Sequence, residues 1–327
     1  MRAQLLTEHG GHDKLKLSEV ARPTPSSGQV LVRIYATAVN PVDIKIREGL
    51  PIAPPLPAIL GADLAGVVEA VGEGVTTFSV GDEVYGCAGG VKGHGGALAE
   101  YIAADARLLA PKPKTLSFRE AAALPLVSIT ARDALDRLEI EAGDRVLIHG
   151  GTGGVGHIAI QLAKAAGAWV VATVGSDDNA AIARQLGADE VVNYRTEAVG
   201  DYVKRLTNGE GFEAIFDTVG GPNLANSFEA AAVEGKIATI NARTTADLGL
   251  MHSKALSLTA VFMLLPMLRG IGRERHGDIL RAIGSDVDAG RLRPLLDDHR
   301  FTLETAGEAQ ELLSSGKARG KVVIDID

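Results

Sequence analysis

The chain has 327 residues, more than one hydrophobic core usually serves, so two domains are expected. Lys and Arg number 33 against 41 Asp and Glu, and the net charge of −8 argues against a nucleic-acid partner. The single cysteine, Cys87, excludes an intrachain disulfide and a cysteine-cluster metal site.

Short β-like runs, broken by Gly and Pro, fill the chain from Met1 to about Leu116. This pattern is typical of a compact, partly closed β domain. The clearest runs are 30–35, 64–71, 81–85 and 99–102.

From about Phe118 the pattern changes to alternating helices and strands, which predicts a doubly wound parallel sheet. The expected helices are 118–124, 128–138 and 180–186. The expected strands are 145–149, 169–174, 190–193, 212–217 and 236–240.

The last part of the chain predicts helices at 276–289 and 305–314, a β-like Phe301 and a final strand at 321–326. A terminal strand needs a sheet to join, and the first β domain is the candidate. We therefore expect an α/β domain, 123–263, inserted in a discontinuous β domain made of 1–122 and 264–327. The substrate cleft is expected between the two.

The most informative stretch runs from His149 to Gly156 and reads HGGTGGVG. A strand precedes it and an amphipathic helix follows, which is the order of a dinucleotide-binding βα unit. Gly151, Gly153 and Gly156 match GxGxxG, with expected roles in the tight turn, in close approach to pyrophosphate and in helix-to-strand packing. The helix N-terminus favours phosphate through its N–H groups and dipole. The predicted cofactor-binding residues of the turn are Gly151, Thr152, Gly153, Gly154, Val155 and Gly156.

The longest apolar stretch, 256–268, is too short to span a membrane and contains Pro266. The first residues lack the apolar core of a signal sequence. A cytoplasmic protein without a membrane partner is expected.

The chain resembles the medium-chain dehydrogenase/reductase family, in its zinc-independent quinone oxidoreductase branch, which includes zeta-crystallin-like proteins. The matching segments follow the family order over nearly the full length: 38–49, 61–72, 80–86, the glycine turn, 217–221 and 318–321. The resemblance implies a Rossmann sheet inserted in a discontinuous GroES-like β-barrel domain.

The resemblance also bears on zinc, because zinc-using members carry a cysteine at the position of Asn40 and a histidine at that of Ala62. A catalytic zinc needs three protein ligands, and these two residues with Cys87 do not supply them. Asp63 offers one oxygen, but a single carboxylate does not hold zinc. Alcohol oxidation through a metal-bound alkoxide is therefore disfavoured, and no metal is expected.

The resemblance implies hydride transfer from NADPH to an acceptor that needs little activation, either a quinone or the β-carbon of an enone or enal. An enoyl-thioester reductase is a second interpretation. A non-catalytic NADPH-binding protein, like the crystallin relatives, is a third.

Three residues are candidates for catalysis. Asn40 matches the family position facing the nicotinamide and would hydrogen-bond the developing oxyanion, or else caps the loop before Pro41. Lys45, where relatives often have tyrosine, would polarise a carbonyl or relay a proton if desolvated, or else is a solvated surface lysine. Thr130 matches the threonine beside the nicotinamide, or bonds back to its own helix.

Cofactor choice depends on the end of the second strand of the α/β domain. An NAD enzyme usually carries an acid there, whereas this chain has Gly175 and Ser176, which favours NADPH over NADH. The resemblance implies that Ser176, Tyr194 and Arg195 contact the 2′-phosphate.

Other residues near this strand end leave NADH open. Asn179 replaces a lysine often present in relatives, and Asp177 or Asp178 would still serve as a ribose-binding acid. Asn241 and Arg319 match positions that line the nicotinamide side, or else fix the junction between the domains.

Three further expectations concern the surface and a partner. His94 lies between glycines, as a candidate acid or as part of an exposed loop, and Asp43 and Arg47 are expected to pair along a short helix. The resemblance implies a homodimer in which an edge strand, 257–262, pairs across a two-fold axis. The alternative is a sixth, fully covered strand.

Overall fold

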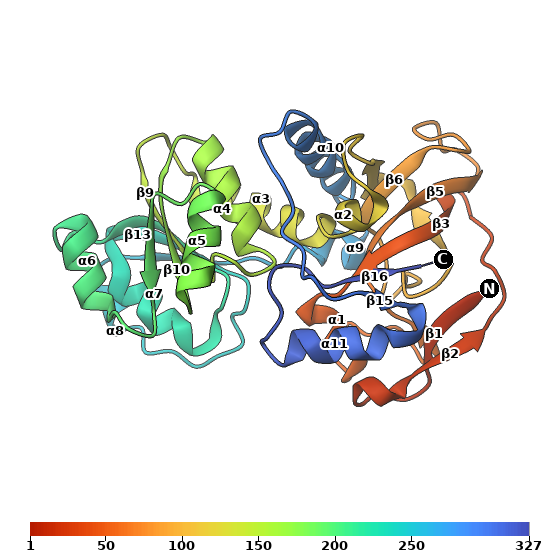
Figure 1. Cartoon of the computed structure of the whole chain (residues 1–327), viewed down its shortest axis with the longest axis horizontal. Helices are drawn as coiled ribbons and strands as arrows, with labels where there is room; N and C mark the ends of the chain where they lie inside the picture. The colour runs from red at the N-terminus through yellow and green to blue at the C-terminus, as the bar shows by residue number, and fades with distance from the viewer. Residues whose placement is uncertain (327) are drawn as a thin grey trace. The chain divides into compact units, whose positions relative to one another are not determined.

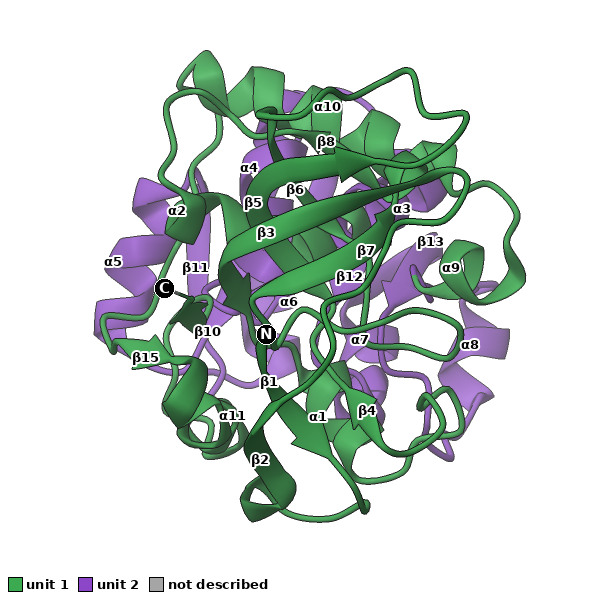
Figure 2. Cartoon of the chain, turned by 90° about the vertical axis from the view of Figure 1, so that its right-hand side faces the viewer, with its two compact units in different colours: residues 1–129, 264–327 green, residues 130–263 purple. Residues whose placement is uncertain are grey.

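A computed structural model describes residues 1–326 of the chain. The chain forms two compact units, which are coloured separately in Figure 2. Unit 1 contains residues 1–129 and 264–327, and unit 2 contains residues 130–263.

Unit 1 is built around a seven-stranded sheet in which β15, β16, β3, β5, β6 and β8 lie in that order and β7 also pairs with β3. Most side chains of β3 and β6 are buried, and in these two strands a clear alternation of buried and more exposed side chains is limited to residues 32–36 of β3. Their bounds are β3 (Gln29–Ala38), β5 (Asp63–Val71), β6 (Glu83–Cys87), β7 (Tyr101–Asp105), β8 (Leu109–Pro111), β15 (Phe301–Thr302) and β16 (Val323–Asp325).

A smaller sheet of unit 1 holds β2 (Leu15–Glu19), β1 (Arg2–Leu6) and β4 (Ala58–Ile59). Neither β1 nor β2 was predicted from the sequence. The helices of this unit are α1 (Pro41–Arg47), α2 (Phe118–Ala122), α9 (Leu265–Arg269), α10 (Glu274–Asp288) and α11 (Ala306–Ser314). Tyr85 of β6 donates its hydroxyl to the carbonyl of Leu280 in α10, which fastens the C-terminal part of unit 1 to the N-terminal part.

The C-terminal strand completes the main sheet of unit 1, as predicted. β16 pairs antiparallel with β3, with Val323 opposite Ala38 and Asp325 opposite Ala36. The backbone N–H of Val39 continues this pairing by donating to the carbonyl of Val322. Segments that precede and follow unit 2 in the chain therefore contribute to one sheet, and unit 2 is an insertion between them.

Unit 2 contains a six-stranded, all-parallel sheet in the order β11, β10, β9, β12, β13, β14. This is the doubly wound 3-2-1-4-5-6 order, so the Rossmann prediction is confirmed. The strands are β9 (Arg145–His149), β10 (Trp169–Val174), β11 (Glu190–Asn193), β12 (Phe212–Asp217), β13 (Ala231–Thr239) and β14 (Ser257–Ala260).

The helices of unit 2 cover both faces of its sheet. Figure 1 shows α4 (Gly156–Ala165) and α5 (Asp177–Gln185) on one side of the strands and α6 (Val199–Thr207) on the other. The unit also contains α7 (Leu224–Ala230) and α8 (Gly249–Ser253), and α3 (Pro125–Leu138) carries the boundary between the units. Leu147, Ile215 and Phe228 belong to the core under β9, β12 and β13.

The strand at 257–260 lies at the edge of the sheet. β14 pairs only with β13 in the described part of the chain, and Ser257 and Ala260 are exposed. The alternative of a fully covered strand is therefore wrong. Across residues 1–326, no helix has the length and apolar character that a membrane span requires.

Candidate dinucleotide site and buried polar cluster

The glycine turn joins β9 to α4 and departs from the expected roles in one respect. Gly150 has a φ of +70°, so it provides the left-handed residue of the turn, a role that we had assigned to Gly151. A Cβ on Gly151 would lie 2.7 Å from the Cβ of Ala172, and one on Gly156 would lie 2.1 Å from the carbonyl oxygen of Gly150. Gly151 and Gly156 are therefore required for packing.

Gly153 is less crowded than Gly151 and Gly156. It is exposed, and a Cβ there would meet only the carbonyl oxygen of Gly150, at 3.2 Å. The turn is held by backbone bonds from Gly151 to Thr173 and from Gly153 to Gly150. Gly153, the position predicted to approach pyrophosphate, is thus the exposed glycine of the turn.

The end of β10 brings together three predicted cofactor-binding residues. A Cβ on Gly175 would lie 2.7 Å from the hydroxyl of Tyr194 and 3.3 Å from Nε of Arg195. Ser176 caps α5 by accepting a hydrogen bond from the backbone N–H of Asn179. The guanidinium of Arg195 lies 6.0 Å from the centre of the Tyr194 ring. Two hydroxyls and one cation thus surround Gly175.

The two aspartates that follow the end of β10 lie in the next helix, α5. Asp177 and Asp178 occupy the first turn of α5 and are exposed. The Oδ1 atom of Asn179 is buried and makes no hydrogen bond within the described chain. The groups nearest to Gly175 are therefore hydroxyls and a guanidinium rather than carboxylates.

No role was predicted for the loop that follows β12, although residues 217–221 are among the segments that resemble the family. Asp217 is fully buried, and its Oδ1 accepts hydrogen bonds from the backbone of Val219 and Gly220 and from the side chain of Asn223. The positive φ of Gly220 brings its backbone against the carbonyl of Asn241, where a Cβ would lie at 2.3 Å. An acid at the end of a buried strand, followed by two glycines, is the sequence signal for such a loop.

This loop meets the glycine turn at the carboxyl edge of the sheet. The hydroxyl of Thr218 donates to the carbonyl of His149, 2.6 Å away, and a Cβ on Gly150 would lie 2.9 Å from that hydroxyl. Burial lowers the pKa of His149 to about 4, so its imidazole is neutral near pH 7. Its Nδ1 lies 3.2 Å from the Thr173 hydroxyl, which also accepts from the N–H of Gly150.

Unit 1 holds a separate cluster of buried polar groups around Asn40. The Nδ2 of Asn40 donates to Oδ2 of Asp63 at 2.9 Å, and its Oδ1 accepts from Nζ of Lys321 at 2.5 Å. The same ammonium reaches the carbonyl of Val39 at 3.1 Å and Oδ2 of Asp63 at 3.4 Å. Asn40, Asp63 and Lys321 are 1%, 0% and 3% exposed.

The cluster is electrostatically unusual because two carboxyl groups share one cation. Asp43 accepts from the backbone N–H of Asn40 at 2.8 Å, and burial raises the pKa of Asp43 to about 7. Burial also raises the pKa of Asp63, against the opposing effect of the Lys321 ammonium. Cys87 lies in the same surroundings, where burial raises the pKa of its thiol.

Two other predicted site residues in unit 1, Lys45 and Arg319, are exposed. Lys45 lies in the last turn of α1 and is exposed, as the solvated alternative expects. Arg319 is also exposed, and its backbone N–H donates to Asp297. The expected pairing of Asp43 with Arg47 is wrong, because the guanidinium of Arg47 contacts the carbonyl of Gly10 and the side chain of Gln310.

Two further residues were candidates from the sequence. Thr130 is buried in α3, at 4% exposure. His94 is half-buried, and its Nε2 lies 3.2 Å from the carbonyl of Met267 and 3.2 Å from the guanidinium of Arg273. Burial lowers the pKa of His94, which favours its neutral form.

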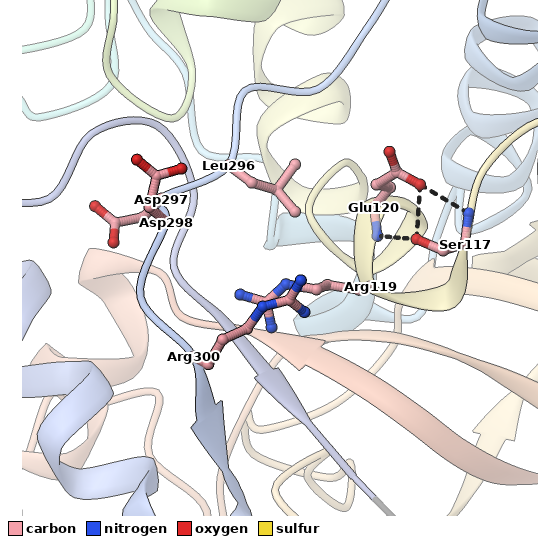
Figure 3. Close-up of a pocket in the computed structure, with 7 residues that line it drawn as sticks. All are labelled: Ser117, Arg119, Glu120, Leu296, Asp297, Asp298 and Arg300. Atoms are coloured by element: carbon pink, nitrogen blue, oxygen red, sulfur yellow. Dashed lines mark hydrogen bonds between the residues drawn. The ribbon is translucent and has the colours of Figure 1, made fainter.

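A surface pocket of unit 1, with a volume of about 360 Å³, contains none of the predicted site residues. Figure 3 shows Arg119 and Arg300 side by side, Asp297 and Asp298 at another part of the pocket lining, and the capping hydrogen bonds between Ser117 and Glu120. Arg119 is already paired with Asp325 at 2.7 Å. The mixed charge and existing pairs give this pocket no clear ligand preference.

Metal ligands are not grouped in either unit. Among residues 1–326, no three His, Cys, Asp or Glu side chains are arranged so that they could hold a metal ion. Both oxygens of the Asp63 carboxylate already accept hydrogen bonds, from Leu126 and from Asn40.

Comparison with known proteins agrees with this architecture. The family described as "Alcohol dehydrogenase GroES-like domain" matches residues 26–114, and the one described as "Zinc-binding dehydrogenase" matches residues 186–324. The chain is 33% identical to a quinone oxidoreductase of Rattus norvegicus over 329 residues, covering 99% of this chain and 97% of the relative. It therefore belongs to the medium-chain dehydrogenase/reductase superfamily, in its quinone oxidoreductase branch.

Two other relatives extend the comparison. An NADPH-dependent alkenal/one oxidoreductase, chloroplastic, of Arabidopsis thaliana is 34% identical over 333 residues, covering 99% of this chain and 79% of that protein. The crystal structure of Escherichia coli quinone oxidoreductase complexed with NADPH superposes with a TM-score of 0.90 at 29% identity, covering 99% of this chain and 100% of that one.

The contrast between Gly153 and Gly156 generates a test of the dinucleotide site. Gly153→Val should cost little stability, since its Cβ would meet a single atom, the Gly150 carbonyl oxygen at 3.2 Å, but should weaken NADPH binding by more than about 100-fold by blocking the phosphates. Gly156→Val should instead destabilise unit 2 by about 1–3 kcal/mol, because its Cβ would overlap the Gly150 carbonyl. Fluorescence titration of NADPH and thermal unfolding without cofactor separate the two effects. Wild-type affinity in Gly153→Val would refute the assignment.

Proposed function

We propose that the protein is an NADPH-dependent oxidoreductase that reduces quinones or activated alkenes such as enones and enals, without a metal. The observation that carries the proposal is the site in unit 2. A glycine turn exposed at Gly153 lies on the same sheet edge as Gly175, which is surrounded by Ser176, Tyr194 and Arg195 rather than by a carboxylate.

In the proposed binding mode, different residues of unit 2 bind different parts of NADPH. The backbone of residues 151–156 holds the pyrophosphate, aided by the N-terminus of α4. Ser176, Tyr194 and Arg195 hold the 2′-phosphate, because a guanidinium and hydroxyls are better partners for that dianion than for a ribose diol. Asn241, fixed against Gly220, lines the nicotinamide side.

The bound cofactor supplies the hydride in this proposal. Asn40 would donate its second Nδ2 hydrogen to the oxyanion that develops on the acceptor, since that hydrogen has only a 3.5 Å contact with the carbonyl of Ala38. Thr130 would contact the nicotinamide, and the proton that completes the reduction would come from solvent, because Lys45 is exposed rather than desolvated. Arg319, in the C-terminal segment, would line the nicotinamide side of the site.

The cluster around Asn40 supports the metal-free form of the proposal. A zinc ion here would have to share Asp63 with the ammonium of Lys321, which hydrogen-bonds both Asp63 and Asn40. Like charges in a buried site repel strongly, so the lysine disfavours a bound dication. Quinones and conjugated carbonyl compounds are suitable acceptors because hydride transfer to them does not require a Lewis acid.

The names of the relatives support the same acceptor class. One is a quinone oxidoreductase and another an NADPH-dependent alkenal/one oxidoreductase. The proposed function for this chain includes both types of acceptor, quinones and activated alkenes.

The direct test is the initial rate of NADPH and NADH oxidation with a quinone, an enal and an enoyl thioester, each with and without a chelator. We expect turnover with the quinone or the enal that favours NADPH and resists the chelator. Preference for the thioester would indicate an enoyl-thioester reductase. Tight NADPH binding without turnover of any acceptor would indicate a non-catalytic binding protein.

The role of Arg195 in cofactor choice can be tested separately. Arg195→Ala should raise the KM for NADPH by about tenfold or more, because it removes charge-assisted bonds to the 2′-phosphate, and should leave the KM for NADH almost unchanged. Arg184→Ala is the matched control, since Arg184 is an exposed arginine at the end of α5. Equal effects of Arg195→Ala on both cofactors would rule out a specific phosphate contact.

We also propose a homodimer formed through β14. This strand has one unpaired edge in the described chain, and an exposed edge is a suitable surface for pairing with a second copy. Ala260→Lys should shift the mass measured by light scattering from dimer to monomer by placing like charges at the two-fold contact. Glu190→Lys, on the opposite edge strand β11, is the control. A monomeric wild-type protein would contradict the proposal.

A further inference from the structure

The buried ammonium of Lys321 is placed by the register of two strands that are distant in sequence. Val323 of β16 lies opposite Ala38 of β3, so the antiparallel register brings residue 321 opposite residue 40. The hydrogen bond from the backbone of Val39 to Val322 confirms that the pairing extends to this point. Lys321 therefore meets Asn40 as a consequence of closing the main sheet of unit 1.

All three N–H groups of the ammonium have partners. They are the carbonyl of Val39, Oδ1 of Asn40 and Oδ2 of Asp63, at 3.1, 2.5 and 3.4 Å. An ammonium has three donors and no acceptor, so none is left for a substrate oxygen. Lys321 is thus unsuited to polarise an acceptor directly, and any effect on the reaction must pass through its partners.

Asn40 receives its orientation from this arrangement. Its Oδ1 accepts from the Lys321 ammonium and its Nδ2 donates to the Asp63 carboxylate. Exchanging Oδ1 and Nδ2 would place the amide donor against the ammonium and the amide oxygen against the carboxylate, so both hydrogen bonds would be lost. Only one orientation satisfies both neighbours. The remaining Nδ2 hydrogen is therefore held in a fixed direction, which a lone asparagine beside a proline would not achieve.

Asp63 links the same cluster to a helix. Its Oδ1 accepts from the backbone N–H of Leu126 at 2.8 Å, in the first turn of α3, where a carboxylate also interacts favourably with the helix dipole. Thr130 lies on this helix, one turn further along. One buried carboxylate thus contacts both the carboxamide of Asn40 and the start of the helix that carries Thr130.

We propose that Lys321 and Asp63 are positioning residues that fix the orientation of the Asn40 carboxamide for hydride transfer. The inference rests on the proposed function for the role of Asn40, but the orientation itself can be measured without turnover. A purely structural role for the pair would change stability alone.

The variants separate charge balance from positioning. Lys321→Met leaves Asp63 and Asp43 buried without their cation, so the Tm should fall by about 10 °C. The double variant Asp63→Asn with Lys321→Met removes one charge of each sign, so Asp43 loses its like-charged neighbour together with the cation, and most of that loss should be recovered. Lys112→Met is the matched control, since Lys112 is a buried lysine of unit 1 that binds the carbonyls of Pro113 and Leu116.

The kinetic test compares the change in kcat with the change in the Kd for NADPH. In the double variant we expect kcat to remain about 10- to 100-fold below wild type while the Kd for NADPH changes little, since nothing fixes Oδ1 of Asn40. Lys112→Met should keep the wild-type kcat even where its Tm falls. Joint recovery of Tm and kcat in the double variant would overturn the proposal.

A readout independent of activity keeps failure of the inference distinct from failure of the proposed function. Exchange of the Asn40 side-chain amide hydrogens is followed by NMR, with Asn40→Ala identifying the signal. These hydrogens should be protected in the wild-type protein and in Lys112→Met, and should exchange at least about tenfold faster in the double variant. Unchanged protection would overturn positioning. Faster exchange in a protein that turns over no acceptor would refute the proposed function alone.

Discussion

The closure of the main sheet of unit 1 by its last strand is the constraint on which the rest of that unit depends. β16 reaches β3 only after the whole of unit 2 has been inserted, and the pairing of Val323 with Ala38 fixes what lies beyond the end of each strand. Beyond β3 comes the N-cap of α1, Asn40, and before β16 comes Lys321. A slip of one residue would turn Lys321 to the other face of the sheet and leave Asp63 without its cation.

Unit 2 obeys a different constraint, which is that parallel strands all end at one edge. The ends of β9, β10, β12 and β13 therefore deliver the glycine turn, Gly175, the Asp217 loop and Asn241 to the same edge. The close contacts among these loops use glycine where a Cβ would collide, as at Gly150 and Gly220. Asp217 and Thr218 hold the loops by hydrogen bonds, so the edge is organised without a ligand.

The sequence was sufficient for the features that depend on local patterns. The Rossmann sheet, the glycine turn and the joining of the last strand to the first domain follow from strand, turn and helix signals that are adjacent in the chain. The assignment of the tight turn to Gly151 failed because GxGxxG does not include Gly150, the residue whose positive φ makes the turn. Sequence spacing identifies the position of a glycine. It does not indicate whether glycine is needed there for a positive φ or because a Cβ would collide with a neighbouring atom.

Features that depend on distant contacts were not predictable in the same way. Lys321 and Asn40 are 281 residues apart, and a lysine beside glycine in a C-terminal segment is usually solvated. The predicted pairing of Asp43 with Arg47 is wrong because the guanidinium of Arg47 instead hydrogen-bonds Gly10 and Gln310, which come from elsewhere in unit 1. The short strands β1 and β2 were missed because their apolar residues are few and belong to a small sheet.

The arrangement of Lys321 also bears on the range of acceptors. A metal ion with an open position binds an acceptor oxygen directly and so activates carbonyls that are otherwise unreactive. The ammonium of Lys321 has no open position, because its three donors are used within the protein. A site built in this way provides fixed hydrogen bonds but no Lewis acid. We infer that it suits acceptors whose own conjugation stabilises the added electron pair, which is the property that quinones, enones and enals share.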